Sequence, residues 1–287
     1  MSAFGFLLHG DRDLARSLGA DLTRWLIERG HEVRLLERDA ARAGYPTLAF
    51  EESEFAAGLD LIVGIGGDGT MLDAVTLATA DDIAVLGINV GQLGYLTAVE
   101  PEHAHGAIKR FLAGAYTIED RMRIGGVARR ANGTQEVISP ALNEVLVERA
   151  ELGHTIRVDV ALDGAPFTPY VADAIILATP TGSTAYAFSA RGPIMDPRMS
   201  AQVLVPVAPH MLFDRPLVLA PTSMVRMTVS GSRPAHLSVD GHSEMHLDPG
   251  DSILCTAADT PARLVRFPSP NRHHHHVLKT KFGLPDR

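Results

Sequence analysis

The chain has 287 residues, of which 46% are hydrophobic and 21% are charged, and its formal net charge is −8. This length favours two domains with sizeable cores, and the negative charge argues against nucleic acid as a partner because no basic field is available to displace counterions. No apolar run reaches membrane-spanning length and no signal-peptide pattern opens the chain, so we expect no membrane partner.

Strands and helices alternate through the first part of the chain. Apolar runs predict strands, and apolar residues at helical spacing predict helices over 13–29, 70–78 and 103–113. The predicted strands cover residues 3–8, 32–36, 61–65 and 83–89. Such alternation is typical of βαβ units with a mostly parallel sheet, in which ligands bind at the carboxyl ends of strands. We therefore expect an α/β domain over residues 1–115.

From about Tyr116 the pattern changes to short β-rich segments. Turn dipeptides such as Asn132-Gly133, Asp163-Gly164 and Asp240-Gly241 separate them. The predicted strands cover residues 123–129, 144–149, 155–162, 174–178, 203–207, 224–229, 236–239 and 252–257. We expect an all-β domain over 116–262, and then a tail over 263–287 that returns to the first domain. We interpret four histidines in this tail, at 273–276, as a solvated run in preference to a metal site.

A glycine-rich turn follows the predicted strand at 61–65. It contains Gly66, Gly67, Asp68 and Gly69, and Thr70 begins the next predicted helix. A strand, a glycine turn and a helix N-terminus together favour phosphate binding, because backbone N–H groups can approach the anion. Asp68 would repel phosphate unless a metal ion or a proton transfer required it there. The alternative is that Asp68 only caps the helix.

Three further segments carry polar side chains next to predicted strands. Asn143 and Glu144 can together accept from and donate to ribose hydroxyls, or they form an exposed turn pair. The segment 179–186 holds four hydroxyls, one glycine and Tyr186 immediately after an apolar strand, which suits a nucleotide. Asp173 precedes the same strand and is either a buried ligand contact or a charge at the sheet edge.

Taken together, these segments resemble the NAD kinase family. The resemblance rests on Gly66 to Thr70, Asn143-Glu144 and Thr179 to Tyr186, and then on Pro209-His210, Arg215-Pro216-Leu217 and Asp240-Gly241-His242. Order and spacing agree over nearly the whole chain, as far as Phe282-Gly283. The glycine-aspartate motif alone is shared with lipid kinases and phosphofructokinases, but its combination with the segment 179–186 is highly specific.

The resemblance implies transfer of phosphate from ATP or polyphosphate to the adenosine 2′-hydroxyl of NAD, which gives NADP. It also implies Mg²⁺, with no direct protein ligand assigned, and a homodimer or homotetramer. The single cysteine, Cys255, suits a cytoplasmic location.

The resemblance further implies roles for individual residues. Asp68 would be the base, Asn143 and Glu144 would hold a ribose, Asp173 would face the nicotinamide end, and Tyr95 would stack on the adenine. The remaining expected substrate contacts are Gly69, His154, Thr184, Ala185, Tyr186, Ser189 and His242. The donor phosphates would meet Gly66, Gly67, Gly69 and Thr70.

Three positions depart from the family pattern. Arg191 and Ala174 stand where members usually carry glycine, and Asp73 stands where many carry a basic residue. Asp73 suits a helix N-terminus electrostatically but removes a possible phosphate contact. Two alternatives remain at this point. A lipid kinase would have no use for Asn143-Glu144, and a non-catalytic NAD(P)-binding regulator would have no use for Asp68.

Overall fold

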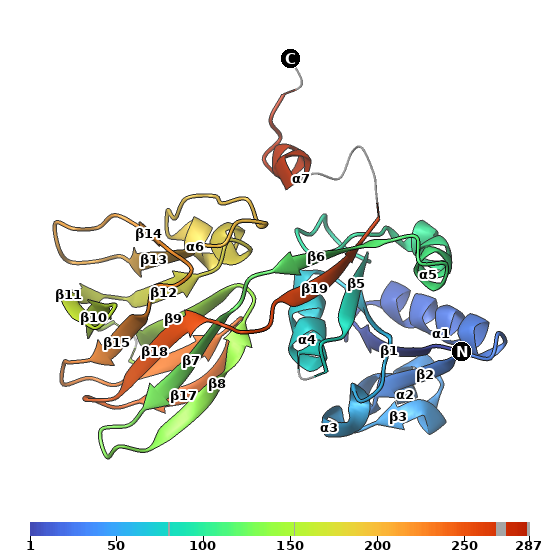
Figure 1. Cartoon of the computed structure of the whole chain (residues 1–287), viewed down its shortest axis with the longest axis horizontal. Helices are drawn as coiled ribbons and strands as arrows, with labels where there is room; N and C mark the ends of the chain where they lie inside the picture. Colours follow the sequence, from blue (N-terminus) through green and yellow to red (C-terminus); the bar gives the residue numbers. More distant parts are fainter. Residues whose placement is uncertain (80, 152, 268–273, 286–287) are drawn as a thin grey trace. The chain divides into compact units, whose positions relative to one another are not determined.

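The computed structural model of the chain describes residues 1–79, 81–151, 153–267 and 274–285. The chain divides into two compact units. The first unit comprises Met1–Asp120 and Ala262–Arg287, and the second comprises Arg121–Pro261 (Figure 1). Among the described residues, no helix combines the length and apolar character needed to cross a membrane.

The first unit is built on a seven-stranded sheet with the order β3-β2-β1-β4-β5-β19-β6. Its strands are β1 (Ala3–Leu8), β2 (Glu32–Leu36), β3 (Ala49–Phe50), β4 (Leu61–Gly66), β5 (Ala84–Asn89), β6 (Thr117–Arg121) and β19 (Ala262–Arg266). The five neighbouring pairs from β3 to β19 are all parallel. The prediction of a mostly parallel sheet is thereby confirmed, and the strand that follows the second unit joins this sheet beside β5.

Helices cover both faces of this sheet (Figure 1). They are α1 (Asp13–Ile27), α2 (Glu37–Ala43), α3 (Glu52–Phe55), α4 (Asp68–Ala78) and α5 (Ala104–Leu112), with short 3₁₀ turns η1 (Pro46–Leu48) and η2 (Pro101–His103). A further helix of this unit, α7 (His274–Lys281), contains no buried residue. The odd-numbered residues of β4, such as Val63, share one core with Leu22 of α1 and Ile108 of α5. On the opposite face, Gly64 leaves room for Met71, so α4 packs closely there.

The second unit contains two six-stranded antiparallel sheets. Their orders are β11-β10-β15-β18-β7-β8 and β14-β13-β12-β9-β16-β17. One core receives side chains from both sheets, for example Val158 and Ile253 from the former and Val145 and Ile175 from the latter. The two sheets therefore form a sandwich, and the prediction of an all-β second region is confirmed.

Eight of the twelve strands described in the sandwich follow the predicted segments closely, and the other four, at 135–141, 165–172, 217–219 and 242–247, were not predicted. The twelve strands are β7 (Ile124–Arg129), β8 (Gln135–Ala141), β9 (Glu144–Arg149), β10 (Ile156–Leu162), β11 (Ala165–Ala172), β12 (Ala174–Ala178), β13 (Gln202–Val207), β14 (Leu217–Leu219), β15 (Val225–Val229), β16 (Ala235–Val239), β17 (His242–Leu247) and β18 (Ser252–Ala257). The turn at Asp240 and Gly241 has φ values of 50° and 84°, as the Asp-Gly signal predicts for a tight hairpin. After β12 come a 3₁₀ turn, η3 (Gly182–Thr184), and a short helix, α6 (Tyr186–Ser189).

Some elements carry too weak a signal to be predicted from sequence. The strand β11 contains Pro166 and Pro169, and it lies at the edge of its sheet, where a missing N–H is tolerated. The helix α2 is short, and its buried side chains are Asp39 and two alanines, so it lacks an apolar stripe. Of the histidine run, His274 to His276 begin α7, whereas His273 lies outside the described residues.

Candidate functional site

The glycine turn after β4 presents open backbone at the start of α4. Gly67 is the N-cap residue, and α4 begins at Asp68. A Cβ on Gly66 would collide with the side chain of Thr70, so this position requires glycine. Within the described part of the chain, no atom lies within 4 Å of the place where a Cβ would stand on Gly67 or Gly69. Both glycines line a pocket at the N-terminus of α4, where backbone N–H groups have no intrahelical acceptor and favour an anion.

The Asp68 carboxylate is held by a neighbouring loop. Its two oxygens accept the backbone N–H groups of Tyr95 and Leu96 at 3.0 and 2.9 Å. Gly94 makes this possible, since a Cβ there would stand 2.5 Å from Oδ1 of Asp68. The helix cap is Gly67 and makes no side-chain hydrogen bond, so the alternative of Asp68 as a helix cap is wrong. Asp68 is instead a carboxylate of fixed orientation beside a phosphate-binding type of turn.

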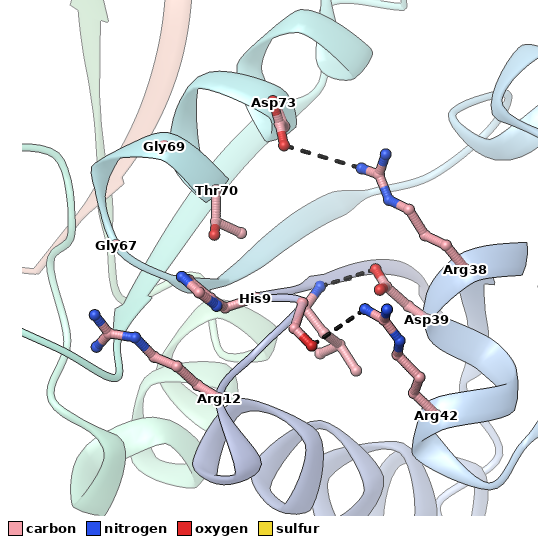
Figure 2. Close-up of a pocket in the computed structure, with 11 residues that line it drawn as sticks. His9, Arg12, Arg38, Asp39, Arg42, Gly67, Gly69, Thr70 and Asp73 are labelled. Atoms are coloured by element: carbon pink, nitrogen blue, oxygen red, sulfur yellow. Dashed lines mark hydrogen bonds and ion pairs between the residues drawn. The ribbon is translucent and has the colours of Figure 1, made fainter.

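A pocket of about 350 Å³ opens beside the glycine turn (Figure 2). It lies at the carboxyl end of β1 and is lined by Leu8, His9, Gly10, Arg12, Arg38, Asp39, Arg42, Gly67, Gly69, Thr70 and Asp73. The lining includes three arginines and two aspartates. One of those carboxylates, Asp39, is 1% exposed and accepts the Leu8 N–H at 3.0 Å. Burial raises the pKa of Asp39, partly offset by that hydrogen bond and by the charges of Arg38 and Arg42.

Tyr95 is the aromatic side chain of the loop that holds Asp68. Its ring is partly buried, and burial, together with the negative charge of Asp68, raises the pKa of its hydroxyl. In α7, Lys281 places its Nζ 3.9 Å from the centroid of the Tyr95 ring, and the His274 ring lies 6.3 Å away. The ring of Tyr95 is therefore engaged by the C-terminal helix through a cation–π contact.

In the second unit, Asp240 fixes the start of β9. Its carboxylate accepts the N–H groups of Leu142, Asn143 and Glu144 at 2.7, 2.7 and 3.0 Å. Burial raises the pKa of Asp240, against the lowering effect of these three donors and of His242. The late turn predicted from sequence thus positions the asparagine-acid pair, although almost a hundred residues separate them in the chain.

Glu144 is a buried acid with an unused oxygen. The residue is 8% exposed, and Tyr186 donates its backbone N–H to the carboxyl group. Among the described residues, no hydrogen-bond partner reaches its buried Oε2. Burial and then the negative charge of Asp240 raise the pKa of Glu144 to about 8. At neutral pH this carboxyl group is mostly protonated, so it can both donate to and accept from a sugar hydroxyl.

The hydroxyl-rich turn after β12 is held together mainly by its own side chains. Thr179 Oγ1 donates to Leu142 and accepts the Gly182 N–H, while Ser183 Oγ accepts the Met195 N–H at 2.9 Å. Thr181 accepts from Arg121 at 3.1 Å. These three hydroxyl residues are buried, whereas Thr184 is only partly so. The expectation that all four hydroxyls suit a nucleotide therefore differs from the structure, in which three of them stabilise the turn.

The other residues expected in the dinucleotide site are more accessible. Asp173 is about one-third exposed and pairs with Arg149 at 2.7 Å. Tyr186 is 41% exposed, and burial and the charges of Glu148 and Asp173 raise the pKa of its hydroxyl. Ala185 is partly buried, and three further expected residues are exposed, namely His154, Ser189 and His242.

The structure thus gathers the expected residues into two groups. The first unit holds Gly66, Gly67, Asp68, Gly69, Thr70 and Tyr95, and the second unit connects Asn143, Glu144, Asp240 and Tyr186 through the hydrogen bonds above. The pocket adds His9, Arg12, Arg38 and Arg42, which sequence reasoning did not identify. A signal for them existed, because all four follow closely after β1 or β2, at the carboxyl ends of parallel strands.

The side chains of this site suit a divalent cation that is bound mainly by the phosphates of a ligand. In the described part of the chain, no three His, Cys, Asp or Glu side chains group as metal ligands would. Mg²⁺ commonly keeps several waters and uses one or two carboxylates together with substrate phosphates. In the pocket, Asp73 is the accessible carboxylate, with its side chain 37% exposed.

Comparison with known proteins gives matches over most of the chain. Residues 4–116 match the model of the ATP-NAD kinase N-terminal domain, and residues 142–267 match that of the ATP-NAD kinase C-terminal domain. The NAD kinase of Moorella thermoacetica is 37% identical over 268 residues, which cover 93% of this chain and 85% of that protein. The NAD kinase of Syntrophotalea carbinolica is 34% identical over 268 residues, covering 93% of each.

Solved structures show the same fold. The crystal structure of an NAD kinase from Archaeoglobus fulgidus in complex with ATP aligns with a TM-score of 0.72 at 25% identity, covering 97% of this chain and 98% of that one. The crystal structure of yeast NADH kinase complexed with NADH aligns with a TM-score of 0.90 at 24% identity, covering 100% and 89%.

Proposed function

We propose, from the premise that this chain belongs to the NAD kinase family, that it phosphorylates the adenosine 2′-hydroxyl of NAD to give NADP. The donor is ATP, as the ATP complex of the Archaeoglobus fulgidus relative suggests, or polyphosphate. The observation that carries the proposal is the fixed carboxylate of Asp68 at the phosphate-binding type of turn before α4.

In the proposed reaction, the 2′-oxygen of NAD attacks the terminal phosphorus of the donor. A new oxygen–phosphorus bond forms, the bond from that phosphorus to the bridging oxygen breaks, and ADP or a shortened polyphosphate leaves. Asp68 accepts the proton of the hydroxyl. An alcohol is a weak nucleophile at neutral pH, and a positioned base typically contributes about 10²–10⁴-fold to the rate. The N–H groups of Tyr95 and Leu96 donate two hydrogen bonds that fix the Asp68 carboxylate, so little reorientation precedes proton transfer.

The glycine turn would bind the donor phosphates through the backbone of Gly66, Gly67 and Gly69, with the Thr70 hydroxyl as a further contact. Mg²⁺ would accompany these phosphates and neutralise their charge. Asp73 is the side chain that would face such an ion, directly or through water, because it is the accessible carboxylate of the pocket.

NAD would be bound by residues of the second unit. The protonated Glu144 and the amide of Asn143 would hold a ribose, which the unused Oε2 of Glu144 supports. Asp173, kept in place by Arg149, would face the nicotinamide end. Tyr95 would stack on the adenine, and the remaining dinucleotide contacts would be His154, Thr184, Ala185, Tyr186, Ser189 and His242.

We also propose a homodimer or homotetramer in which Tyr186 and its neighbours contribute to a site completed by another subunit. The exposed ring of Tyr186 and the family membership support this. Light scattering at assay concentration tests it, and a fully active monodisperse monomer would contradict it. A cytoplasmic location is proposed because the single, buried cysteine suits a reducing compartment.

One coupled assay of NADP formation tests the central proposal. Purified protein is incubated with NAD and either ATP or polyphosphate at several Mg²⁺ concentrations, and NADP is detected with an NADP-specific dehydrogenase. We expect NADP to accumulate with at least one donor and to depend on Mg²⁺. Absence of NADP with both donors at every Mg²⁺ concentration would refute the proposed function.

A further inference from the structure

We infer that Arg12, Arg38 and Arg42 bind the phosphate chain of the donor in the pocket beside α4, whatever group that chain carries. The inference deepens the proposed function and rests on it for the identity of the ligand as a phosphate donor. The geometry itself points to an elongated polyanion, because the cations come from separate elements and surround one cavity.

The three arginines reach the pocket from two directions. Arg12 immediately precedes α1, whereas Arg38 and Arg42 lie one turn apart on α2 and therefore on one face of that helix. In Figure 2, Arg38 and Arg42 lie on the opposite side of the pocket from Gly67, and Arg12 lies on the same side as Gly67. A ligand in this cavity would meet guanidinium groups and the N-terminus of α4, whose dipole favours negative charge.

Among the described residues, few acceptors engage the guanidinium donors of Arg12 and Arg42. Arg12 donates to the Val90 carbonyl at 2.6 Å, and Arg42 donates to the Gly10 carbonyl at 3.2 Å. These bonds orient the two side chains, yet each guanidinium has five N–H donors, so most of them are left for other acceptors. Arginine matches phosphate oxygens in a bidentate manner, which makes it well suited to a phosphate chain.

Arg38 supplies the positive charge that the helix α4 itself lacks. The helix α4 contains no Lys or Arg, and its Asp73 carboxylate lies 3.9 Å from the Arg38 guanidinium. This loose pair is substantially exposed, 55% for Arg38 and 37% for Asp73, so solvent weakens it. A phosphate chain with several charges would compete effectively with one exposed carboxylate for Arg38.

The pocket lining favours phosphate over a nucleobase. Among the described lining residues, Leu8 has the one aliphatic side chain, and there is no Phe, Tyr or Trp. The one aromatic ring is the imidazole of His9, so there is little apolar surface for a base. A ligand recognised here would be recognised by its charge and its oxygens. ATP and inorganic polyphosphate should consequently depend on these arginines to the same degree.

Calorimetric titration with two probes, ATP and inorganic tripolyphosphate, tests the inference on the full-length protein without NAD. The variant Arg38→Ala/Arg42→Ala is compared with Arg157→Ala/Arg226→Ala, which removes two exposed arginines from the second unit. Arg157 is a close match for Arg38, because it also lies 3.9 Å from an aspartate, Asp159, and is 54% exposed. If the Ala variant fails to fold, judged by its melting transition, Arg38→Gln/Arg42→Gln takes its place.

We expect the pocket variant to bind both probes at least about tenfold more weakly than wild type, since charge-assisted hydrogen bonds are lost. The control should bind both within about twofold of wild type at the same ionic strength. Unchanged binding of both probes by the pocket variant, or a loss confined to one probe, would overturn the inference.

The inference and the proposed function can fail separately. A wild type that forms NADP and binds both probes, with a pocket variant that binds equally well, overturns the role of the arginines and leaves the function intact. A wild type that binds tripolyphosphate through these arginines but forms no NADP refutes the function and supports the pocket as a polyphosphate site.

Discussion

The pocket of the first unit and the cluster around Glu144 in the second unit differ in how their charged groups are exposed to solvent. Around the pocket, exposed arginines and an exposed aspartate lie next to open glycine backbone. Around Glu144, two acids are withdrawn from solvent, and burial raises the pKa of both. A phosphate chain carries several charges and calls for cations, whereas a ribose is neutral and calls for aligned donors and acceptors.

Asp240 and Asp68, which each accept more than one backbone N–H group, sharpen this contrast. Asp240 accepts three consecutive N–H groups of the segment that it positions, so its role is structural. Asp68 accepts two from a loop and lies beside open backbone, which leaves it able to accept a proton from a ligand. Backbone N–H groups that donate to a carboxylate thus stabilise the start of β9 in the second unit and orient the proposed base in the first unit.

Asp68→Asn should have the largest effect. If Asp68 is the base, kcat should fall by at least about 10²-fold while NAD still binds. Kinetics and NAD titration measure the two quantities separately. Asn keeps only one acceptor oxygen, so the loss of one loop hydrogen bond costs about 1–3 kcal/mol of stability, which thermal unfolding checks.

Asp60→Asn is the matched control for this change. Asp60 also accepts a backbone N–H, that of Ala3 at 2.8 Å, at the opposite end of β4 from the glycine turn. The Asp60→Asn variant should have a lower free energy of unfolding and an unchanged kcat. Near-normal kcat in a folded Asp68→Asn protein would show that Asp68, like Asp240, has a structural role and is not the base.

Glu144→Gln tests whether the second cluster is kept neutral. The pKa of Glu144 is about 8 in the folded protein and 4.5 when unperturbed. Between pH 4.5 and about 8, Glu144 binds more protons in the folded state than in the unfolded state. The contribution of Glu144 therefore makes the free energy of unfolding fall as pH rises. The slope is at most about 1.4 kcal/mol per pH unit. Urea unfolding from pH 5 to 8 should show a shallower decline for the Gln variant, and identical slopes would mean that Glu144 is ionised when folded.

Asn143→Ala should affect binding more than chemistry. A ribose contact is present in both the ground state and the transition state, so its loss should raise KM for NAD about tenfold with little change in kcat. Steady-state kinetics at saturating donor measure both. Asn132→Ala, in the hairpin turn between β7 and β8, is the control and should leave KM unchanged. A large fall in kcat at constant KM would place Asn143 in the transition state instead.

Arg191→Gly should have the smallest effect, and on stability alone. Arg191 has a φ of 66°, in the left-handed region that costs a non-glycine residue about 1–2 kcal/mol. Because glycine also gains freedom in the unfolded chain, we expect a net stabilisation of at most about 1 kcal/mol. Arg191→Ala keeps the strain and should give none. Equal stabilisation by both variants in urea unfolding would exclude backbone strain as the cause.

Sequence reasoning succeeded where the signal is local. The apolar run of β4, the glycines after it and the Asp-Gly turn at Asp240 each determine their conformation within a few residues. It failed for α2, whose charged heptapeptide has no apolar stripe, and so Arg38 and Arg42 were missed.

Long-range contacts had no signal at all. That Asp240 would bind three N–H groups almost a hundred residues away depends on the pairing of β9 with β16, which a single sequence does not reveal. The burial of Thr179 and Ser183, which converts nucleotide-like hydroxyls into structural ones, has the same origin.

The strand β19 has a consequence for how the protein is made. It pairs with β5 through Leu264 and Val85, and the whole second unit lies between them in the chain. Near its carboxyl end, β5 already bridges to Val99 through Ile88. On the ribosome, the edge of β5 around Val85 remains unpaired until the second unit has been synthesised, which takes on the order of ten seconds or more. Every residue of β5 is buried in the folded protein. During this interval, part of this apolar strand is exposed with unpaired backbone groups, and such an edge can pair with a strand of another chain. The newly synthesised N-terminal segment should thus be a substrate for chaperones that shield strand edges.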